Sequence, residues 1–495
     1  MMFGMSRSRR PPPRLAFLSF LALALTIACE VPGVAGGQAR SAPTPPATSP
    51  TAVAPSPGAS PSPTAAIRPT GTPVYRALWV DAFHDGIKTR SQVNQLIARA
   101  HQANLNALFV QVRKRGDAYF NSGLEQRTND PAVSRGGYDA TTGTYRTAGY
   151  DPLAYVIEQA HAANPPLEVH AWVNTFFVGQ TSDVWQQHPD WTNRMDNGSN
   201  DGYGYLDPGN PAVQAYNRSV FLDIARHYAV DGIHLDFVRY PEGGNWGYTP
   251  AAVASFNAAL GRSGQPDPTD PDFKQWRRDQ VTNFVRDLHD ELLHLPRRVL
   301  LSGALIAYGN GPKTVAEWMK TATYGDVYQD WYRWLQDADL DFGVPMNYDR
   351  DSSPTQAGYF RAWSDWEKDH QGRSRVVIGV GSFENYPEDS MAQVQRALQP
   401  TAAGNRAVGI ALYSYASTSL YGTDDFYLNP ADMGYLPRQP YAPDPSPKAL
   451  AARAAQFNDW FWGALSAPAS YPDPALGSVP TRPIFLAPAP IPSLR

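Results

Sequence analysis

The sequence of 495 residues predicts an α/β fold, a (β/α)8 TIM barrel with long loops at its C-terminal face. Eight short apolar runs resemble strands, and segments with helical periodicity separate most of them. Strands that alternate with helices favour a parallel sheet, and eight such repeats favour closure into a barrel. Polar or aromatic residues follow seven of the eight runs, so they would meet at one mouth of the barrel.

The predicted elements follow one another in a regular order along the chain. The expected strands are Ala77–Val80, Ala107–Val112, Glu168–Val173, Gly232–Phe237, Val299–Leu305, Phe342–Met346, Val376–Val380 and Gly409–Tyr413. The expected helices are Gln92–Gln102, Ala154–Ala163, Pro211–Tyr228, Pro271–Leu293 and Met391–Leu398, with Ser91 as the N-cap of the first.

Two connections that follow predicted strands are long. Gly116 to Gly149 is rich in Gly, Asp, Thr and Tyr, and Thr175 to Leu206 is rich in Trp, Asn, Gly and Tyr. Both would emerge at the C-terminal face of the barrel, where loops carry function. They predict a cleft rather than a flat surface.

The N-terminal segment has the pattern of an export signal. Residues 1–28 combine a basic leader with an apolar run, Leu15–Ile27, that is too short to cross a bilayer comfortably. Cys29, the only cysteine, follows Leu25–Ala28, which resembles a lipobox. We expect lipidation at Cys29 and a membrane-anchored lipoprotein of the bacterial envelope; ordinary secretion is the alternative.

The regions on either side of the barrel differ from it in composition. Residues 29–73 are rich in Pro, Ala, Ser and Thr and predict a disordered tether, because they hold too few apolar side chains for a core. The barrel domain is expected at 74–435 and a C-terminal extension at 436–495. The extension should contain a helix near 448–465 that packs on the barrel, followed by a Pro-rich tail of coil.

Composition narrows the class of partner. The net charge is −4, which does not suggest a nucleic-acid-binding face. No cofactor is expected. The chain holds 13 Trp and 26 Tyr, and part of this aromatic content could line a sugar-binding cleft or simply fill a large core.

The segment Asp231–Pro241 is the strongest functional signal. His234 and Asp236 are two residues apart in the predicted strand, so they share one face, while Ile233 and Leu235 take the other. A carboxylate at the C-terminal end of a buried strand is costly unless it is paired or used. Asp236 is therefore the expected centre of an active site.

Further polar and aromatic residues lie at the ends of the other strands. Any one of them is more often structural: His170 and His234 could be satisfied core histidines, and Arg113 or Arg239 could neutralise a carboxylate. Asp207 before Pro211 is explained by turn and capping chemistry. The candidates for substrate binding are Asp81, Arg113, His170, Trp172, Asn174, His234, Arg239, Asn347, Tyr348 and Tyr413.

Four segments resemble the motifs of the glycosyl hydrolase-like family 10 proteins, over roughly Tyr75 to Ser417. They are Arg76–Val80, Glu168–Asn174, Leu206–Pro211 and Asp231–Pro241. The resemblance implies a bacterial envelope lipoprotein with a (β/α)8 barrel that hydrolyses a glycan, since some relatives cut peptidoglycan strands that have lost their stem peptides. The segment Val344–Asp349 departs from the Pro-Gln-Ile-Tyr type of many members.

Glycoside hydrolysis generally uses two carboxyl groups that flank one bond. Asp236 is the expected nucleophile or charge stabiliser, kept ionised by Arg113 or Arg239. Asp349 is the first candidate for the proton donor, because it ends the sixth strand, expected across the mouth from the fourth. Capping of a loop would explain Asp349 equally well. The next candidates are Glu384 and then Glu242.

Two other classes of function remain open at this stage. A glycan-binding barrel without catalysis would use Trp172, Trp185, Trp191 and Trp246 as platforms and need no paired acid. A metal-dependent hydrolase would use His170 and His234 with Asp236, although the sequence has no HxH or HExxH pattern. A second carboxyl near Asp236 favours the glycosidase, and a cluster of histidines favours the metal enzyme.

Overall fold

The computed structural model describes residues 71–134, 138–139, 144–145, 149–200, 204–419, 447–473 and 477–494. All of these belong to one compact unit, Ile67–Arg495. The predicted signal peptide 1–28, the lipidation site Cys29 and the tether up to residue 70 lie outside the described residues. Within the described ranges, no helix combines the length and apolarity that crossing a membrane requires.

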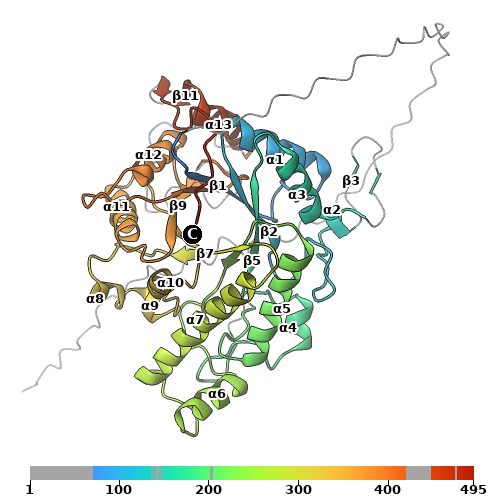
Figure 1. The fold of residues 1–495 in the computed structure, drawn as a ribbon, viewed down its shortest axis with the longest axis vertical. Helices are drawn as coiled ribbons and strands as arrows, with labels where there is room; N and C mark the ends of the chain where they lie inside the picture. The colour runs from blue at the N-terminus through green and yellow to red at the C-terminus, as the bar shows by residue number, and fades with distance from the viewer. Residues whose placement is uncertain are drawn as a thin grey trace, which may run out of the picture. The chain divides into compact units, whose positions relative to one another are not determined.

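Eight parallel strands close into a barrel, so the predicted fold class is confirmed (Figure 1). The order around the barrel is β1-β10-β9-β8-β7-β6-β5-β2, in which every predicted strand takes part. Their bounds are β1 Tyr75–Val80, β2 Ala107–Arg113, β5 Glu168–Asn174, β6 Gly232–Asp236, β7 Leu300–Ile306, β8 Phe342–Asn347, β9 Arg375–Gly381 and β10 Gly409–Tyr413. Two small hairpins lie outside the barrel, β3 Tyr138–Asp139 with β4 Thr144–Tyr145, and β11 Ala469–Asp473 with β12 Gly477–Thr481.

Helices surround the barrel on its outer side (Figure 1). The predicted helices are present as α1 Arg90–Gln102, α3 Pro152–Ala162, α5 Pro211–His227, α7 Pro271–Leu293, α12 Pro387–Leu398 and, in the C-terminal extension, α13 Pro447–Ser466. The helices that were not predicted are α2 Pro131–Ser134, α4 Asp183–Gln187, α6 Pro250–Leu260, α8 Val315–Trp318, α9 Ala322–Gly325, α10 Trp331–Asp337 and α11 Pro354–Asp369.

Capping explains where several helices begin. In α5, Asn210 accepts a hydrogen bond from the Ala212 amide, and Pro211, which has no N–H to satisfy, occupies the first turn. The prediction for α1 was wrong by two residues: Thr89, not Ser91, is the N-cap, and its Oγ1 accepts from the Gln92 amide.

Alternation along the strands separates the barrel interior from the helix layer. Trp79 and Phe109 belong to an apolar cluster inside the barrel, whereas Ile233 and Leu235 pack in the larger cluster beneath the helices. This is the division predicted for β6. At Gly232 the fit is so close that a Cβ atom would lie 2.2 Å from Nδ1 of His170. Only glycine fits there.

The Pro-rich tail does not lie loosely on the surface. Ile491 and Leu494 pack against the interior cluster at the N-terminal end of the barrel, and Figure 1 shows the C-terminal end of the chain over the ring of strands. The Val74 amide donates to the Pro490 carbonyl at 3.0 Å, and Asn106 Nδ2 to the Ala489 carbonyl at 3.2 Å. The tail therefore closes the end of the barrel opposite the mouth.

We expect the tail to contribute to stability through Phe485. Its ring is 1% exposed and lies 4.4 Å below the Arg76 guanidinium, while the neighbouring Leu486 is 74% exposed. Phe485→Ala should lower the free energy of unfolding by about 3 kcal/mol or more. Leu486→Ala should change it by less than about 0.5 kcal/mol. Denaturant unfolding of both variants measures this; equal effects would show that the tail is not part of the core.

Candidate active site

Asp236 ends β6 at the mouth of the barrel and is held from several sides. Trp172 Nε1 donates to its Oδ2 at 3.1 Å, and the Phe237 amide donates to its Oδ1 at 2.7 Å. Arg239 Nη1 lies 3.8 Å from the same Oδ1. The side chain is nearly buried, so these contacts fix the direction in which the carboxyl points.

The charge state of Asp236 reflects a balance between burial and these contacts. Burial raises the pKa of the carboxyl, while Arg239, the Phe237 amide and Trp172 oppose the rise. Arg239 acts in the predicted direction, but the net pKa is raised rather than lowered. Arg113 does not take part. Its guanidinium is buried and donates to the Asn174 and Thr175 carbonyls and, at 2.6 Å, to Glu125, so it joins β2 to β5.

Asp349 and Glu384 form a second acidic group at the mouth. Asp349 follows β8, and Glu384 lies in a 3₁₀ turn, Ser382–Glu384, that follows β9. Burial and the charge of Glu384 raise the pKa of Asp349 to about 8. Burial also raises the pKa of Glu384, against the opposing charge of Arg350, whose Nε lies 3.9 Å away. The negative charge of Glu384 thus disfavours ionisation of Asp349.

Tyr348 connects the two acidic groups. Burial and the charges of Tyr413, Asp236 and Glu384 raise the pKa of its hydroxyl well above the usual value. Its hydroxyl therefore lies within electrostatic range of both Asp236 and Glu384. We call Asp236, Asp349 and Glu384 the carboxyl cluster. Only β7 separates β6 from β8 in the barrel. The prediction that Asp349 lies across the mouth from Asp236 was therefore wrong.

Aromatic rings pack around the carboxyl cluster. Tyr413 at the end of β10 lies 5.3 Å from Tyr348, 5.4 Å from Phe383 and 6.2 Å from Trp172, measured between ring centroids. Tyr348 and Tyr413 keep partial exposure, whereas Trp172 is buried. The mouth thus has a partly exposed aromatic wall beside its acids.

The two predicted histidines lie deeper in the barrel. His170 is buried at the N-terminal end of β5, where its Nε2 is 3.1 Å from Glu168. His234 is stacked on Phe109 at 4.3 Å, and its Nε2 accepts from Trp79 at 3.0 Å. Burial holds the pKa of His234 well below its usual value, so the ring is neutral. These positions do not support the predicted roles in substrate binding.

The histidines also do not form a metal site with Asp236. Throughout the described part of the chain, no three His, Cys, Asp or Glu side chains are grouped as metal ligands. The geometry therefore gives no support to the metal-dependent alternative.

Two predicted asparagines turn away from the mouth. Asn347 Nδ2 donates to Glu367 of α11 at 2.9 Å, in the helix layer, where burial raises the pKa of Glu367 to about 8. Asn174 is fully buried; its Nδ2 donates to the Lys114 carbonyl at 2.6 Å and its Oδ1 accepts from Gln111. Both side chains organise the strand ends.

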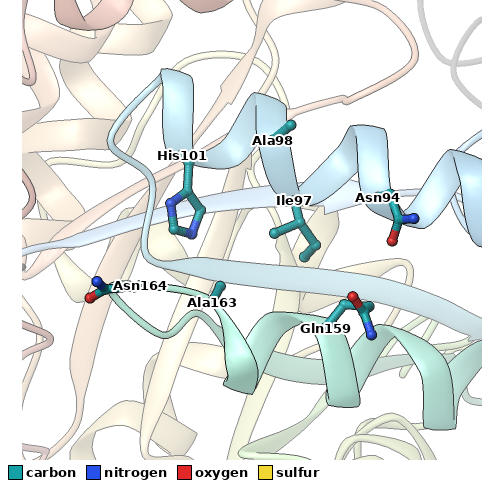
Figure 2. A pocket seen from close by; sticks show the side chains of 7 residues that line it. All are labelled: Asn94, Ile97, Ala98, His101, Gln159, Ala163 and Asn164. Atoms are coloured by element: carbon teal, nitrogen blue, oxygen red, sulfur yellow. The ribbon is translucent and has the colours of Figure 1, made fainter. Parts of the chain in front are cut away.

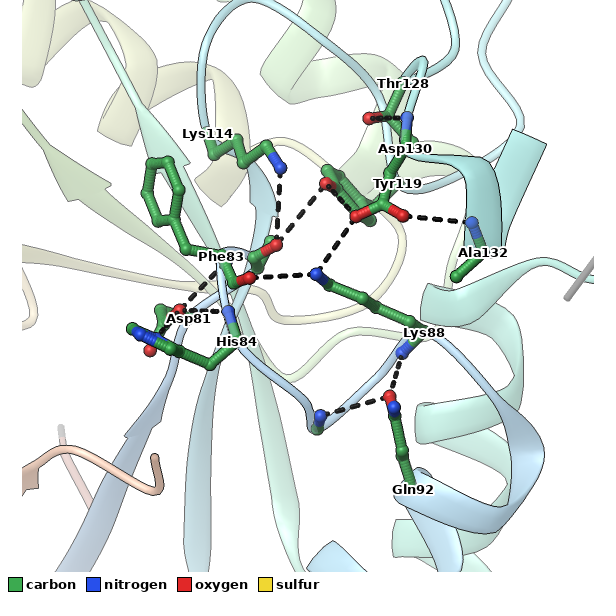
Figure 3. Close-up of polar contacts among 12 residues, drawn as sticks. Asp81, Phe83, His84, Lys88, Gln92, Lys114, Tyr119, Thr128, Asp130 and Ala132 are labelled. Atoms are coloured by element: carbon green, nitrogen blue, oxygen red, sulfur yellow. Dashed lines mark hydrogen bonds and ion pairs between the residues drawn. The ribbon is translucent and has the colours of Figure 1, made fainter. Parts of the chain in front are cut away.

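Asp81 shapes the loop that follows β1 (Figure 3). Its Oδ1 accepts from the Phe83 and His84 amides, each at 2.9 Å, and lies 2.8 Å from His84 Nδ1. Lys88 and Lys114 fasten the same loop through the Phe83 and Ala82 carbonyls, at 2.9 and 3.3 Å. Asp81 is 4% exposed. Its carboxylate therefore stabilises its own loop and is not presented to a ligand.

Glu242, the third candidate for the acid, accepts a hydrogen bond from the Tyr308 hydroxyl. The charge of Arg239 acts on Glu242 as well as on Asp236. A hollow on the outer wall lies between α1 and α3 and holds no carboxyl group (Figure 2). Its lining residues are Asn94, Ile97, Ala98, His101, Gln159, Ala163 and Asn164.

Sequence reasoning missed two residues that organise the site. Arg350 faces Glu384, and Asn385 binds the backbone on both sides of the acidic pair. Both directly follow a predicted acid in the sequence, Asp349 and Glu384 respectively. Their position next to a predicted acid was the sequence signal that could have identified them.

The raised pKa of Asp349 predicts a pH-dependent effect on stability. The folded protein keeps its proton up to about pH 8, whereas an unfolded aspartate loses it near 3.8, so ionisation destabilises the fold as pH rises between these values. Asparagine cannot ionise. The melting temperature of Asp349→Asn, measured relative to that of the wild type, should therefore rise from pH 5 to pH 9. The exposed Asp190→Asn serves as control; an equal gain there would contradict the assignment.

Two curated proteins are similar to this chain in sequence. Glycosyl hydrolase YngK of Bacillus subtilis (strain 168) is 24% identical over 350 residues, 62% of this chain and 60% of that protein. Glycosyl hydrolase DigH of Escherichia coli (strain K12) is 25% identical over 311 residues, 57% of this chain and 63% of that protein. The chain thus spans less than two thirds of the length of these relatives.

Among solved structures, the PgaB (BpsB) glycoside hydrolase domain from Bordetella bronchiseptica superposes with a TM-score of 0.48 and 14% identity. The match covers 69% of this chain and 94% of that domain. The family model described as glycosyl hydrolase-like 10 matches residues 74–395, well over half of the chain. The chain belongs to the glycosyl hydrolase-like 10 family.

Proposed function

We propose that this protein hydrolyses glycosidic bonds in a polysaccharide with the carboxyl cluster at the barrel mouth. The observation that carries the proposal is that two carboxyl groups near one aromatic wall have different partners and different pKa shifts. Asp236 is held by a hydrogen-bonded tryptophan, a backbone amide and an arginine, which favour its ionised form. Asp349 has its pKa raised to about 8 and keeps a proton at neutral pH.

These charge states match the two roles in glycoside hydrolysis. Asp236 would act as nucleophile or as stabiliser of the positive charge that develops on the sugar. Asp349 would protonate the leaving oxygen, and the charge of Glu384 would keep that proton in place until it is needed. Arg350 favours the ionised form of Glu384, and the negative charge of Glu384 favours the protonated form of Asp349.

We further propose that the polysaccharide is a cell-wall glycan, and the family resemblance points to the glycan strand of peptidoglycan. The predicted export signal supports this choice of glycan, and the two relatives named as glycosyl hydrolases support glycoside hydrolysis. Tyr348 and Tyr413 are partly exposed beside the acids and would contact the sugar rings.

The alternative of a glycan-binding barrel without catalysis has less support. Of its four expected platforms, Trp172, Trp185 and Trp246 are at most 9% exposed and belong to the core. Trp191 alone of the four keeps partial exposure, and His188 stacks on its ring at 3.7 Å. A binding face would present its rings to solvent, whereas these rings are mostly covered.

Substitution of the acids tests the proposed roles. Asp236→Asn should abolish turnover and leave folding and glycan binding intact, because the change keeps the shape and removes the charge. Asp349→Asn should slow cleavage of a natural glycan by about 10²–10⁴-fold. It should slow an activated aryl glycoside much less, because that leaving group needs little protonation.

Kinetics on both substrates, with Glu384→Gln measured in parallel, assign the proton donor. If Asp349→Asn slows both substrates equally and Glu384→Gln shows the leaving-group contrast, the donor is Glu384. Full activity of Asp236→Asn would overturn the placement of the site.

We also propose that the protein is exported and anchored to a membrane through a lipid on Cys29. Cys29→Ser should then move the protein from the membrane fraction to the soluble fraction of cells, with turnover unchanged. Immunoblotting of the two fractions measures the distribution. An unchanged distribution would rule out the lipid anchor and leave ordinary secretion.

A further inference from the structure

One buried side chain joins the two loops that carry Asp349 and Glu384. Asn385 is 1% exposed, and its Nδ2 donates to the Asp349 carbonyl and to the Gly381 carbonyl, each at 2.9 Å. Its Oδ1 accepts from the Asp351 amide at 2.8 Å. The amide therefore connects the backbone just after β8 to the backbone at the end of β9.

Helix α12 reinforces this connection. Gln393 Nε2 donates to the same Asp349 carbonyl at 2.8 Å, so that oxygen accepts two side-chain amide bonds. Arg396 pairs with both carboxylate oxygens of Asp351, at 2.5 and 2.7 Å. The loop after β8 is thus held at positions 349 and 351, on either side of Arg350.

The carboxyl of Asp349 has no comparable support of its own. Its Oδ2 is buried and meets no hydrogen-bond donor within the described residues. The position of this acid is consequently set by the backbone that carries it. Catalytic groups must be placed within about 0.5 Å, and loops reach such precision only when other groups hold them.

We infer that Asn385 is a positioning residue, which holds the loop of Asp349 against the loop of Glu384 at the barrel mouth. The inference rests on the proposed function, because it assigns Asn385 a role in supplying the catalytic proton. Asn385 acts through the backbone of Asp349 and Gly381 and does not itself touch the reacting atoms.

The inference predicts the direction of a pH effect. Loss of Asn385 would let the two loops separate, so the charge of Glu384 would act less on Asp349 and water would reach its carboxyl. Both changes lower the pKa of Asp349. The basic limb of kcat/KM reports the proton donor of the free enzyme, so this limb should move to lower pH.

Asn106 offers a matched control at the opposite end of the barrel. It is 5% exposed, its Oδ1 accepts from the Arg76 amide at 2.8 Å, and its Nδ2 donates to the Val74 and Ala489 carbonyls. The pattern of one accepted and two donated backbone bonds is that of Asn385. Replacement of either residue removes the same kind of contact, but only Asn385 lies beside the acids.

The test compares Asn385→Ala with Asn106→Ala in the full chain. Both variants should lose melting temperature. Asn385→Ala alone should move the basic limb of kcat/KM down by about one pH unit and lower kcat on a natural glycan by about 10–100-fold. A smaller loss is expected on an activated aryl glycoside. If the two variants have the same pH profile and the same leaving-group dependence, Asn385 is only structural.

A second readout separates this inference from the proposed function. In protein with ¹³C-labelled aspartate carboxyls, the signal that Asp349→Asn removes should titrate at lower pH in Asn385→Ala than in the wild type. An unchanged titration would overturn the positioning role even in an active enzyme. A shifted titration would support it even if no glycan is cleaved. Should Asn385→Ala fail to fold, Gln393→Ala carries the same two measurements.

Discussion

The cost of burying negative charge at the barrel mouth governs the organisation of this site. Three carboxyl groups lie there, and each has its pKa raised by burial. They respond differently because their partners differ. Asp236 has Trp172, a backbone amide and Arg239 beside it, whereas Asp349 has the charge of Glu384. The partners of Asp236 thus oppose the rise of its pKa, whereas the charge of Glu384 adds to the rise at Asp349.

The two ends of the barrel divide stability from function. At the N-terminal end, Tyr75 donates to Glu168 at 3.0 Å, His170 lies beside the same carboxylate, and the C-terminal tail covers the opening. Glu168 thus accepts from Tyr75 and lies beside His170 at this end. At the other end, the three acids keep 7–8% exposure beside the partly exposed rings of Tyr348 and Tyr413. Inward-facing side chains alternate along the strands at both ends of the barrel. The position of such a residue along the barrel axis therefore decides its role.

Much of the architecture was predictable because it depends on local patterns. Buried parallel strands are short apolar runs and helices have a periodicity of 3.6 residues, so all eight strands and the helices α1, α3, α5, α7, α12 and α13 were recognised. Helices α6, α10 and α11 were missed. Trp363 and Trp366 show the difficulty in α11, since both are buried there and their contacts come from distant parts of the chain. The tail was expected to be coil, and residues 482–494 indeed form no helix or strand. Its hairpin β11–β12 and its packing on the barrel were not predicted, because proline content does not reveal a docking surface.

The order of residue types along the chain established the barrel, the inward direction of His234 and Asp236, and the set of acids near the strand ends, since alternation and strand–helix repeats are local properties. Which acids act together depended on the closed ring of strands. Folding placed His170 at the far end, turned Asn347 toward Glu367 and set Asp349 against Glu384. It also brought Asn385 under both loops. Burial and charge coupling arise only between segments that the fold brings together, so the pKa values that distinguish these acids are properties of the tertiary structure.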